Sequence, residues 1–405
     1  MKIIYISAAR IPSEKAHPYQ ILQMCDAFMS IGVQVELLHP RRRSRNILPN
    51  HGEIQHYYGL QNEVNIITLP ALNTLWIVER YLGALPNLFR FAQRKAYHLM
   101  LDTYYIKAKR YLQSHLADKY YCRDIHTFRW FIKNFPQWKT QLFLEIHDWP
   151  VVKSVNSLVS QLETVGGVIT ITERLKDKCV QYGMDPQRVL VAPDGVNLKR
   201  FEDLPTKTQA RRSLGMPENG IIVAYIGHFY PWKGVETIVR SMDFLPEEYS
   251  ILLVGGWKDD VTRIKQLAAP AQRKRLSTTG YVPPEEVIIY LAAADVLVLP
   301  TSGNKEIGRY YTSPLKLFEY MAAQRPIVAS DLPSLREVLK HKHNAYLVEP
   351  DDPQALAEGI HWVVSQPEVA QLMATQAQND VQEFTWEKRA KRVVEFMRHC
   401  GFYRD

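Results

Sequence analysis

The stretch Tyr311-Thr312-Ser313-Pro314-Leu315-Lys316-Leu317-Phe318-Glu319-Tyr320-Met321 decides how the second half of this chain is interpreted. It predicts a helix that begins with Ser313 as N-cap and Pro314 in the first turn, where a missing N–H costs nothing. The free N–H groups and the positive end of the helix dipole suit a phosphate, and Lys316 adds a full charge in the first turn. Glu319, one turn further on, can accept both hydroxyls of a ribose. The stretch therefore predicts a nucleotide-binding turn.

A second motif has the layout of a phosphate site. Residues 221–226 form a buried-strand pattern that breaks into Gly227-His228-Phe229-Tyr230-Pro231-Trp232-Lys233-Gly234, and a helical pattern follows from 235 to 242. The two glycines let the backbone approach a ligand closely, and Lys233 can place its ammonium on a diphosphate. The alternative is an ordinary tight turn between a strand and a helix.

These two motifs, with residues 280–283 and 294–300 between them, resemble the retaining glycosyltransferases of family 4, which have the two-domain GT-B fold. The order and spacing match, and the resemblance covers nearly the whole chain. It implies a base-contacting loop near Tyr281 and Val282 that reads the base largely through backbone groups. The implied donor-binding residues are Gly227, His228, Lys233, Gly234, Tyr281, Val282, Tyr311, Ser313, Pro314, Leu315, Lys316 and Glu319.

The alternation of short β-rich runs with amphipathic segments predicts an α/β protein with parallel sheets. In the first half we expect strands at 2–7, 33–38, 64–68, 118–122, 142–146, 167–171 and 189–192, and the pattern restarts at Ile221. We therefore predict two Rossmann-like doubly wound domains, an acceptor-binding domain over 1–200 and a donor-binding domain over 201–384. The resemblance implies that they face across a cleft and that a C-terminal helix at 385–405, with Thr385 as candidate N-cap, packs back on the first domain.

Composition agrees with a two-domain enzyme. The chain has 405 residues, a net charge of +8 and four scattered cysteines without metal-ligand spacing. No apolar run approaches the roughly 20 residues that span a bilayer. We expect a cytoplasmic protein, and we interpret residues 2–7 as a strand and not a signal peptide. The positive charge suits an anionic partner, and the basic run 41–45 is either a contact for one or a solvated loop.

The first half contributes a second group of candidates at the end of an apolar strand, Glu145-Ile146-His147-Asp148. The resemblance implies that His147 contacts the transferred sugar near the reaction centre, so we predict His147, Lys233 and Lys316 as the catalytic residues. A structural histidine is the alternative. Glu145 and Asp148 could orient His147 or bind sugar hydroxyls, and Arg123 could contact donor or acceptor.

Three departures from the family pattern are visible. Many members have a glutamate where this chain has Tyr311, and an arginine where it has His228. The family's Gly-Gly loop after the first strand is replaced by residues 12–18, in which we expect Lys15 or His17 to close on the donor. The donor sugar is therefore expected to be held partly by Tyr311 and the backbone after it.

The region from about 72 to 116 is rich in aromatic and basic residues and allows amphipathic helices. It could lie on an anionic membrane or cradle a lipid-linked acceptor, and core packing with a solvated basic face is the alternative.

We predict a retaining, metal-independent hexosyltransferase that uses a UDP- or GDP-linked sugar and a glycan or lipid-linked acceptor, needs no cofactor and does not bind nucleic acid. Exopolysaccharide or cell-surface glycan synthesis at the inner face of the plasma membrane is a plausible setting. Open alternatives are a nucleotide-sugar epimerase or a phosphorylase of the same fold, and a non-catalytic nucleotide-binding protein. A dehydrogenase is disfavoured because no Gly-x-Gly-x-x-Gly fingerprint follows a strand.

Overall fold

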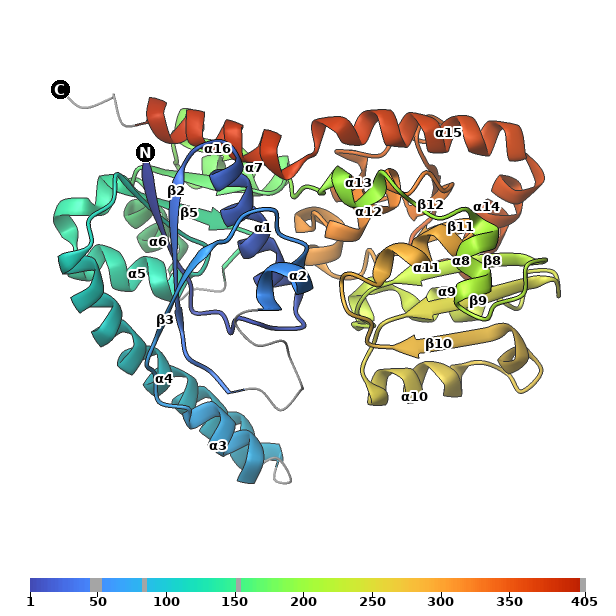
Figure 1. The fold of residues 1–405 in the computed structure, drawn as a ribbon, viewed down its shortest axis with the longest axis horizontal. Helices are drawn as coiled ribbons and strands as arrows, with labels where there is room; N and C mark the ends of the chain where they lie inside the picture. Colours follow the sequence, from blue (N-terminus) through green and yellow to red (C-terminus); the bar gives the residue numbers. More distant parts are fainter. Residues whose placement is uncertain (44–52, 82–85, 151–153, 401–405) are drawn as a thin grey trace. The chain divides into compact units, whose positions relative to one another are not determined.

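A computed structural model describes residues 1–43, 53–81, 86–150 and 154–400, and the chain divides into two compact units (Figure 1). The first unit comprises residues 1–170, 176–192 and 390–405, and the second comprises 171–175 and 193–389. Ser44 and Arg45 of the predicted basic run and residues 401–405 of the predicted last helix lie outside the described residues. No helix within the described ranges is long and apolar enough to span a membrane.

The first unit is built on a seven-stranded parallel sheet in the order β3-β2-β1-β4-β5-β6-β7. Its strands are β1 (Lys2–Ile6), β2 (Gln34–Pro40), β3 (Asn65–Leu69), β4 (Lys119–Cys122), β5 (Leu142–Ile146), β6 (Gly167–Thr170) and β7 (Val189–Val191). Its helices are α1 (Ala16–Ser30), α2 (Ile54–Tyr58), α3 (Thr74–Tyr81), α4 (Pro86–Ser114), α5 (Ile125–Asn134), α6 (Val155–Leu162) and, from Lys176 on, α7 (Glu173–Gln181). All seven predicted strands form.

The second unit holds a six-stranded parallel sheet in the order β10-β9-β8-β11-β12-β13. Its strands are β8 (Ile221–Ile226), β9 (Tyr249–Val254), β10 (Leu276–Gly280), β11 (Val296–Leu299), β12 (Ile327–Ser330) and β13 (Tyr346–Val348). Its helices are α8 (Lys207–Ser213), α9 (Val235–Ser241), α10 (Lys258–Leu267), α11 (Val287–Ala293), α12 (Leu315–Ala322), α13 (Pro333–Arg336), α14 (Pro353–Ser365), α15 (Pro367–Asp380) and the start of α16 (Trp386–His399).

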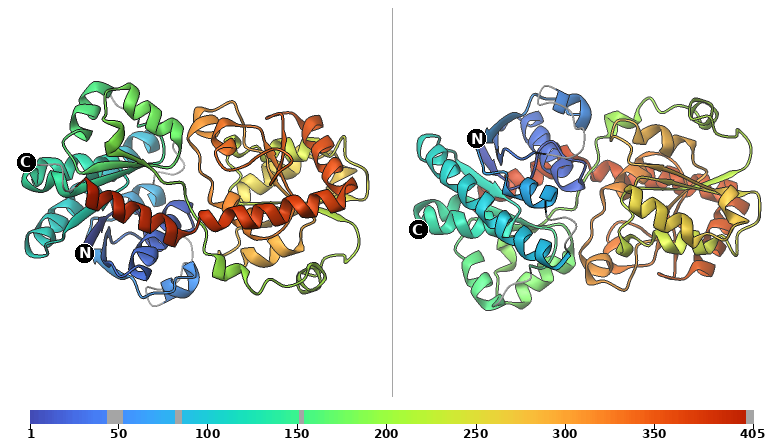
Figure 2. Two further views of the ribbon diagram at one scale, coloured as in Figure 1. Left: turned by 90° about the horizontal axis from the view of Figure 1, so that it is seen from above. Right: turned by 90° about the horizontal axis from the view of Figure 1, so that it is seen from below.

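Helices cover both faces of each sheet (Figure 2), as a parallel sheet requires. In β8 the side chains alternate between two cores: Ile222, Ala224 and Ile226 belong to one apolar cluster, and Val223 and Tyr225 belong to the other. A strand buried on both faces reads as a continuous apolar run, which explains why 221–226 was predictable as a strand. The predicted fold class of two Rossmann-like parallel-sheet units is confirmed.

The strand order indicates where a ligand would bind in each unit. The order reverses beside β1 in the first sheet and beside β8 in the second, and ligands of such sheets bind beyond the carboxyl ends of the strands at that reversal. In the second unit these ends lead into Gly227 after β8 and into Pro300 after β11. The Gly227–Gly234 loop predicted as a phosphate site therefore begins at the reversal.

Helix α16 begins in the second unit and continues in the first. Thr385 caps it as predicted, because its Oγ1 accepts a bond from the Lys388 N–H at 3.2 Å. From Ala390 on the chain belongs to the first unit, where the Phe396 ring lies 5.9 Å from that of Phe143. A Cβ at Gly167 would lie 2.7 Å from the Phe396 ring, so the end of α16 packs directly on the backbone of β6.

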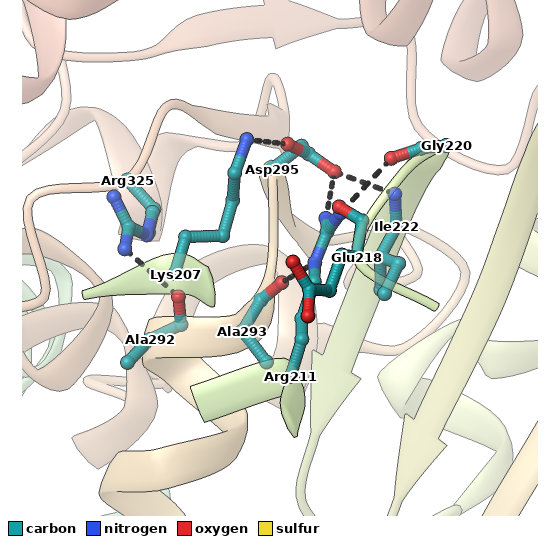
Figure 3. A network of polar contacts seen from close by, with 9 residues as sticks. All are labelled: Lys207, Arg211, Glu218, Gly220, Ile222, Ala292, Ala293, Asp295 and Arg325. Carbon is teal, nitrogen blue, oxygen red and sulfur yellow. Dashed lines mark hydrogen bonds and ion pairs between the residues drawn. The ribbon is translucent and has the colours of Figure 1, made fainter. Parts of the chain in front are cut away.

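A buried arginine fixes the start of the second unit (Figure 3). The Arg211 side chain on α8 is 1% exposed and forms an ion pair with Asp295. Its other N–H groups donate to the Ala293 carbonyl at 2.9 Å and the Glu218 carbonyl at 2.8 Å. Asp295 also accepts a bond from the Ile222 N–H at 2.7 Å, so this carboxylate joins α8 to the entry of β8.

We expect Asp295→Asn to destabilise the second unit by about 3 to 5 kcal/mol, because it leaves the Arg211 charge buried and uncompensated. Lys207, whose side chain is 43% exposed, also pairs with Asp295, and Lys207→Met is the matched control with a cost of about 1 kcal/mol or less. Urea denaturation followed by tryptophan fluorescence measures both. Equal losses in the two variants would contradict the role assigned to Arg211.

Candidate functional site

Two glycines shape the loop after β8. Gly227 has φ +141°, and a Cβ there would lie 2.4 Å from Lys316 Nζ. Gly234 has φ +71° and begins α9, and a Cβ there would lie 1.7 Å from the Pro300 carbonyl oxygen. A side chain at either position would therefore clash as well as strain the backbone. The loop is held against β11 at one end and against the Lys316 ammonium at the other.

Lys316 lies in the first turn of α12 with its ammonium buried. Its Nζ lies 3.6 Å from the centroid of the Tyr225 ring, and the residue is 9% exposed. Among the described residues this Nζ has no hydrogen-bond partner. Burial, and secondly the positive charge of Lys233, hold the pKa of Lys316 well below its ordinary value. A buried ammonium without a hydrogen bond at a helix start is a site prepared for an anion.

Lys233 closes the other side of this anion site. It ends the short 3-10 turn Pro231–Lys233, and its Nζ lies 3.7 Å from the centroid of the Trp232 ring. Burial lowers the pKa of Lys233 from 10.5 to about 7. The positive charge of Lys233 is the second cause, after burial, of the lowered pKa of Lys316. Together the two predicted lysines can supply up to two positive charges to one ligand group.

Glu319 stands one turn beyond Lys316, as the sequence predicted. Its Oε1 lies 3.8 Å from an Arg200 guanidinium nitrogen. Burial raises the pKa of Glu319, and the nearby charges of Arg200 and then Lys316 oppose that shift. Arg200 also donates to the Pro284 carbonyl at 2.5 Å. The sequence analysis missed Arg200 because no motif surrounds it, and the contact spans more than a hundred residues.

The prediction that Ser313 caps α12 is wrong. The helix begins at Leu315 with Pro314 in the N-cap position, and no side chain caps it. The Ser313 hydroxyl instead accepts a bond from the Asp194 N–H at 3.0 Å. A proline in the N-cap position offers no capping side chain, and the Leu317 N–H donates to the Pro314 carbonyl at 2.8 Å. The N-cap residue therefore leaves the N–H groups of Leu315 and Lys316 without a capping bond.

Tyr311 ends a π-helical turn, Ile307–Tyr311, and is 4% exposed. Its hydroxyl donates to the Glu306 carboxylate at 3.3 Å. The structure therefore provides a carboxylate beside the position at which the sequence has a tyrosine in place of the family's glutamate. The sequence analysis missed Glu306 because the π-helical turn changes the spacing along the chain.

Aromatic side chains gather beside the predicted base loop. The Tyr281 ring stacks on Trp257 with centroids 5.6 Å apart and an angle of 8° between the planes. The His228 ring lies 6.2 Å from Trp257 and stacks on Tyr230 at 5.2 Å. Val282 packs against the core. Trp257 follows Gly255 and Gly256, both with positive φ, and this glycine pair after β9 is the signal that could have revealed it.

The first unit has its own polar cluster at the carboxyl ends of β4 and β5. Glu145, whose side chain is fully buried, forms an ion pair with His147 and accepts a bond from the Tyr121 hydroxyl. It also accepts from Gln20 Nε2 at 2.6 Å, and Gln20 Oε1 accepts from Arg123 at 2.6 Å. Glu145 thus orients His147, which was one of the two roles predicted for it.

His17, on α1, belongs to the same cluster. Its Nε2 is buried and makes no hydrogen bond within the described ranges. Burial, followed by the charges of Arg123, His147 and Lys15, keeps the pKa of His17 well below its ordinary value, so the ring is neutral at pH 7. Lys15, just before α1, is exposed. Asp148 accepts a bond from the Trp149 N–H at 2.8 Å.

Known proteins resemble the two units. Residues 206–380 match the family model described as glycosyl transferases group 1. A D-inositol 3-phosphate glycosyltransferase of Xylanimonas cellulosilytica is 27% identical over 237 residues, which cover 56% of this chain and 55% of the relative. An uncharacterized glycosyltransferase of Methanocaldococcus jannaschii is 27% identical over 234 residues, covering 56% of this chain and 58% of the relative. The chain thus spans little more than half the length of these curated relatives.

Solved structures show the same fold over the whole chain. HepE of Anabaena in complex with UDP and glucose superposes with a TM-score of 0.74 at 16% identity and covers 98% of this chain and 100% of its own. Sucrose-phosphate synthase of Thermosynechococcus elongatus gives a TM-score of 0.75 at 21% identity and covers 98% of each chain. These likenesses agree with the predicted GT-B fold.

We expect Lys233→Met to stabilise the ligand-free protein, and the gain to depend on pH. Lys233 has a folded pKa of about 7 against 10.5 when solvated, so the folded state binds fewer protons between these values. The cost of burying the charge is full below about pH 7 and disappears as the pH rises toward 10.5. The stability gap between variant and wild type should therefore shrink over that range.

Thermal unfolding at intervals from pH 6 to 10 measures this gap. Lys265→Met, which replaces an exposed lysine of α10, is the matched control and should show no comparable pH dependence. An unchanging gap, or a Lys233→Met protein less stable than wild type at pH 6, would show that Lys233 is not buried as a free cation.

Proposed function

We propose that this chain, whose residues 206–380 match the family model described as glycosyl transferases group 1, is a retaining hexosyltransferase that uses a nucleotide diphosphate sugar. The observation that carries the proposal is the pair of buried lysines, Lys233 and Lys316, beside the start of α12. One has no hydrogen bond among the described residues, and burial depresses the pKa of both. A diphosphate would supply the anion that both ammonium groups lack.

The chemical step follows from where charge develops. As the bond from the anomeric carbon to the diphosphate breaks, negative charge grows on the leaving group. Lys316, Lys233 and the first N–H groups of α12 would stabilise that charge in a site of low dielectric constant, where such interactions are strong. We propose that these groups take the part that a divalent metal plays in other enzymes, so that transfer needs no metal.

We propose that the family's same-face attack by the acceptor hydroxyl retains the anomeric configuration, with His147 against the transferred sugar. The contact with the buried Glu145 supports this role, because it holds the imidazole in one orientation. His17 and Arg123, which belong to the same cluster, would contact the donor or the acceptor.

For the donor we propose a UDP-linked hexose, with GDP as the alternative base. HepE of Anabaena has been solved in complex with UDP and with UDP-glucose, which supports uracil and glucose by analogy. The stacked pair of Trp257 and Tyr281 beside the predicted base loop offers an aromatic surface for the base. Glu319 and Arg200 would bind the ribose hydroxyls, and Glu306 with Tyr311 would bind the sugar.

The acceptor we propose is a glycan or a lipid-linked glycan, in exopolysaccharide or cell-surface glycan synthesis in the cytoplasm. This part of the proposal depends on the family resemblance. An epimerase or a phosphorylase would form a product without an acceptor glycan. A binding protein would bind the nucleotide without forming any product.

We expect Lys316→Met and Glu319→Ala each to weaken UDP binding about tenfold to a hundredfold, because each removes a charge-assisted contact. Isothermal calorimetry at pH 7 with and without EDTA measures the affinity, and EDTA should change nothing. Lys265→Met, which replaces an exposed lysine of the same unit, is the control for Lys316→Met. Wild-type affinity in both variants would refute the site, whereas normal UDP binding without transfer to any acceptor would favour a non-catalytic protein.

We expect Glu145→Gln to lower the transfer rate about tenfold or more while leaving the UDP affinity unchanged, because the amide cannot hold His147 in an ion pair. Glu163→Gln, an exposed glutamate of the same unit, is the control. An unchanged transfer rate would show that Glu145 is only structural.

A further inference from the structure

Helices α3 and α4 carry an unusual group of exposed apolar side chains. Ile77 is 50% exposed on α3, and Leu72, just before it, is 51% exposed. On α4, Phe91 is 61%, Leu99 47% and Ile106 55% exposed. Four of these residues lie on α3 and α4, which are adjacent helices of the first unit (Figure 1), and Leu72 precedes α3. Their exposure is not explained by the core of that unit, which α4 contacts through another face.

The two faces of α4 are distinct. Its inner face packs into an apolar cluster through Ala96, Met100, Leu101, Tyr104, Tyr105 and Ala108. At 100° per residue, Phe91, Leu99 and Ile106 fall within an arc of about 80° on the outer face and extend over about 22 Å of helix. The packing of the inner face therefore does not account for the outer stripe.

Hydrogen bonds fix the start of α3 against α4. The Leu72 N–H donates to Thr103 Oγ1 at 3.1 Å, and Thr74 Oγ1 donates to the Ala96 carbonyl at 2.7 Å. These bonds join the start of α3 to the middle of α4. The exposed apolar groups of both helices therefore keep their positions relative to one another.

Positive charge flanks the stripe. Arg94, Lys95, Lys107 and Arg110 are exposed on α4 from Phe91 on, and Asp102 is the acidic residue among them. The Lys95 Nζ lies 4.5 Å from the Phe91 ring centroid, so a cation stands directly on the stripe. Over residues 72–116 the sequence has seven basic residues and two acidic ones. Apolar groups in a basic surround match an anionic lipid headgroup layer and the acyl chains beneath it.

We propose that the outer face of α4, with Leu72 and Ile77, docks on an anionic membrane surface. The helix would lie in the plane of the interface, with Phe91, Leu99 and Ile106 below the headgroups and the long cations extending up to the lipid phosphates. The docking does not depend on the proposed transfer reaction. If both hold, the protein works where a lipid-linked acceptor is found.

A second copy of this chain fits the stripe less well. A helix seam needs apolar residues every three to four positions, and the positions between the apolar residues are Lys95 and Asp102. Burying these charges in a seam would cost more than it gains. At a membrane surface the same charges stay solvated.

Vesicle sedimentation with the full-length protein tests the proposal. We expect binding to vesicles of phosphatidylcholine with 30% phosphatidylglycerol, weak binding to pure phosphatidylcholine, and loss of binding as salt screens the headgroups. The double variants Phe91→Ser/Leu99→Ser and Lys95→Glu/Lys107→Glu should each lower the partition coefficient about tenfold or more. Leu372→Ser and Lys265→Glu, exposed residues of the second unit, are matched controls and should leave it unchanged.

Two results would overturn the proposal. One is wild-type protein that does not bind the anionic vesicles in 0.1 M salt, or variants that bind as the wild type does. The other is a concentration-dependent dimer in sedimentation velocity that the apolar variant abolishes, which would make a second copy the occupant of this face. Because vesicle binding needs no turnover, failure here leaves the proposed transferase untouched, and loss of UDP binding leaves the docking untouched.

Discussion

The second unit depends on one constraint: the Lys316 ammonium is buried, and no described residue makes a hydrogen bond to it. Gly227 has no side chain because Lys316 occupies the space where a Cβ would be. Tyr225 and Trp232 place the electron-rich faces of their rings under the two lysines, which partly compensates the charge. The remaining cost is the reason that these lysines suggest a function and not a structural role.

The sheet topology explains why this charge lies where it does. The reversal of strand order beside β8 opens the edge of the sheet at the carboxyl ends of β8 and β11. The loop after β8 brings Lys233 to that edge, and the bond from the Ile226 N–H to the Tyr320 hydroxyl at 2.8 Å ties the end of β8 to α12. The same logic in the first unit brings Glu145 and His147 to the ends of β4 and β5. Each unit thus prepares one polar site on an apolar frame.

Much of the fold was predictable from the sequence because the central strands are buried on both faces and read as apolar runs. The two glycine positions and the two lysines were predictable for a related reason, since a glycine at a strand end and a cation in a first helical turn are local signals. Ser313 shows the limit of local reasoning. A serine before Pro-Leu is a good cap by preference, but the Asp194 N–H, distant in sequence, takes its hydroxyl.

Three residues of the candidate site were not predicted from the sequence: Arg200, Glu306 and Trp257. Tertiary packing brings Arg200 to Glu319, a π-helical turn brings Tyr311 to Glu306, and a glycine pair precedes Trp257. None of these features leaves a periodic pattern in the sequence. The stripe on α4 is a different case. The composition of residues 72–116 suggested a membrane surface, but only the burial of the opposite face shows which apolar residues the core does not use.

The most direct test of the account is the number of protons taken up when UDP binds at pH 8. Calorimetry in buffers of different ionisation enthalpy measures it, and the diphosphate is already fully ionised at this pH. With a pKa of about 7, Lys233 is mostly neutral at pH 8 in the free protein, so a diphosphate that needs its charge should bring about one proton with it. The pKa of Lys316 is also held well below its ordinary value by burial, so Lys316 can add to this uptake. Uptake should fall when Lys233 or Lys316 is replaced by methionine. UDP binding without proton uptake would contradict the central claim that these buried lysines are the cations of the site.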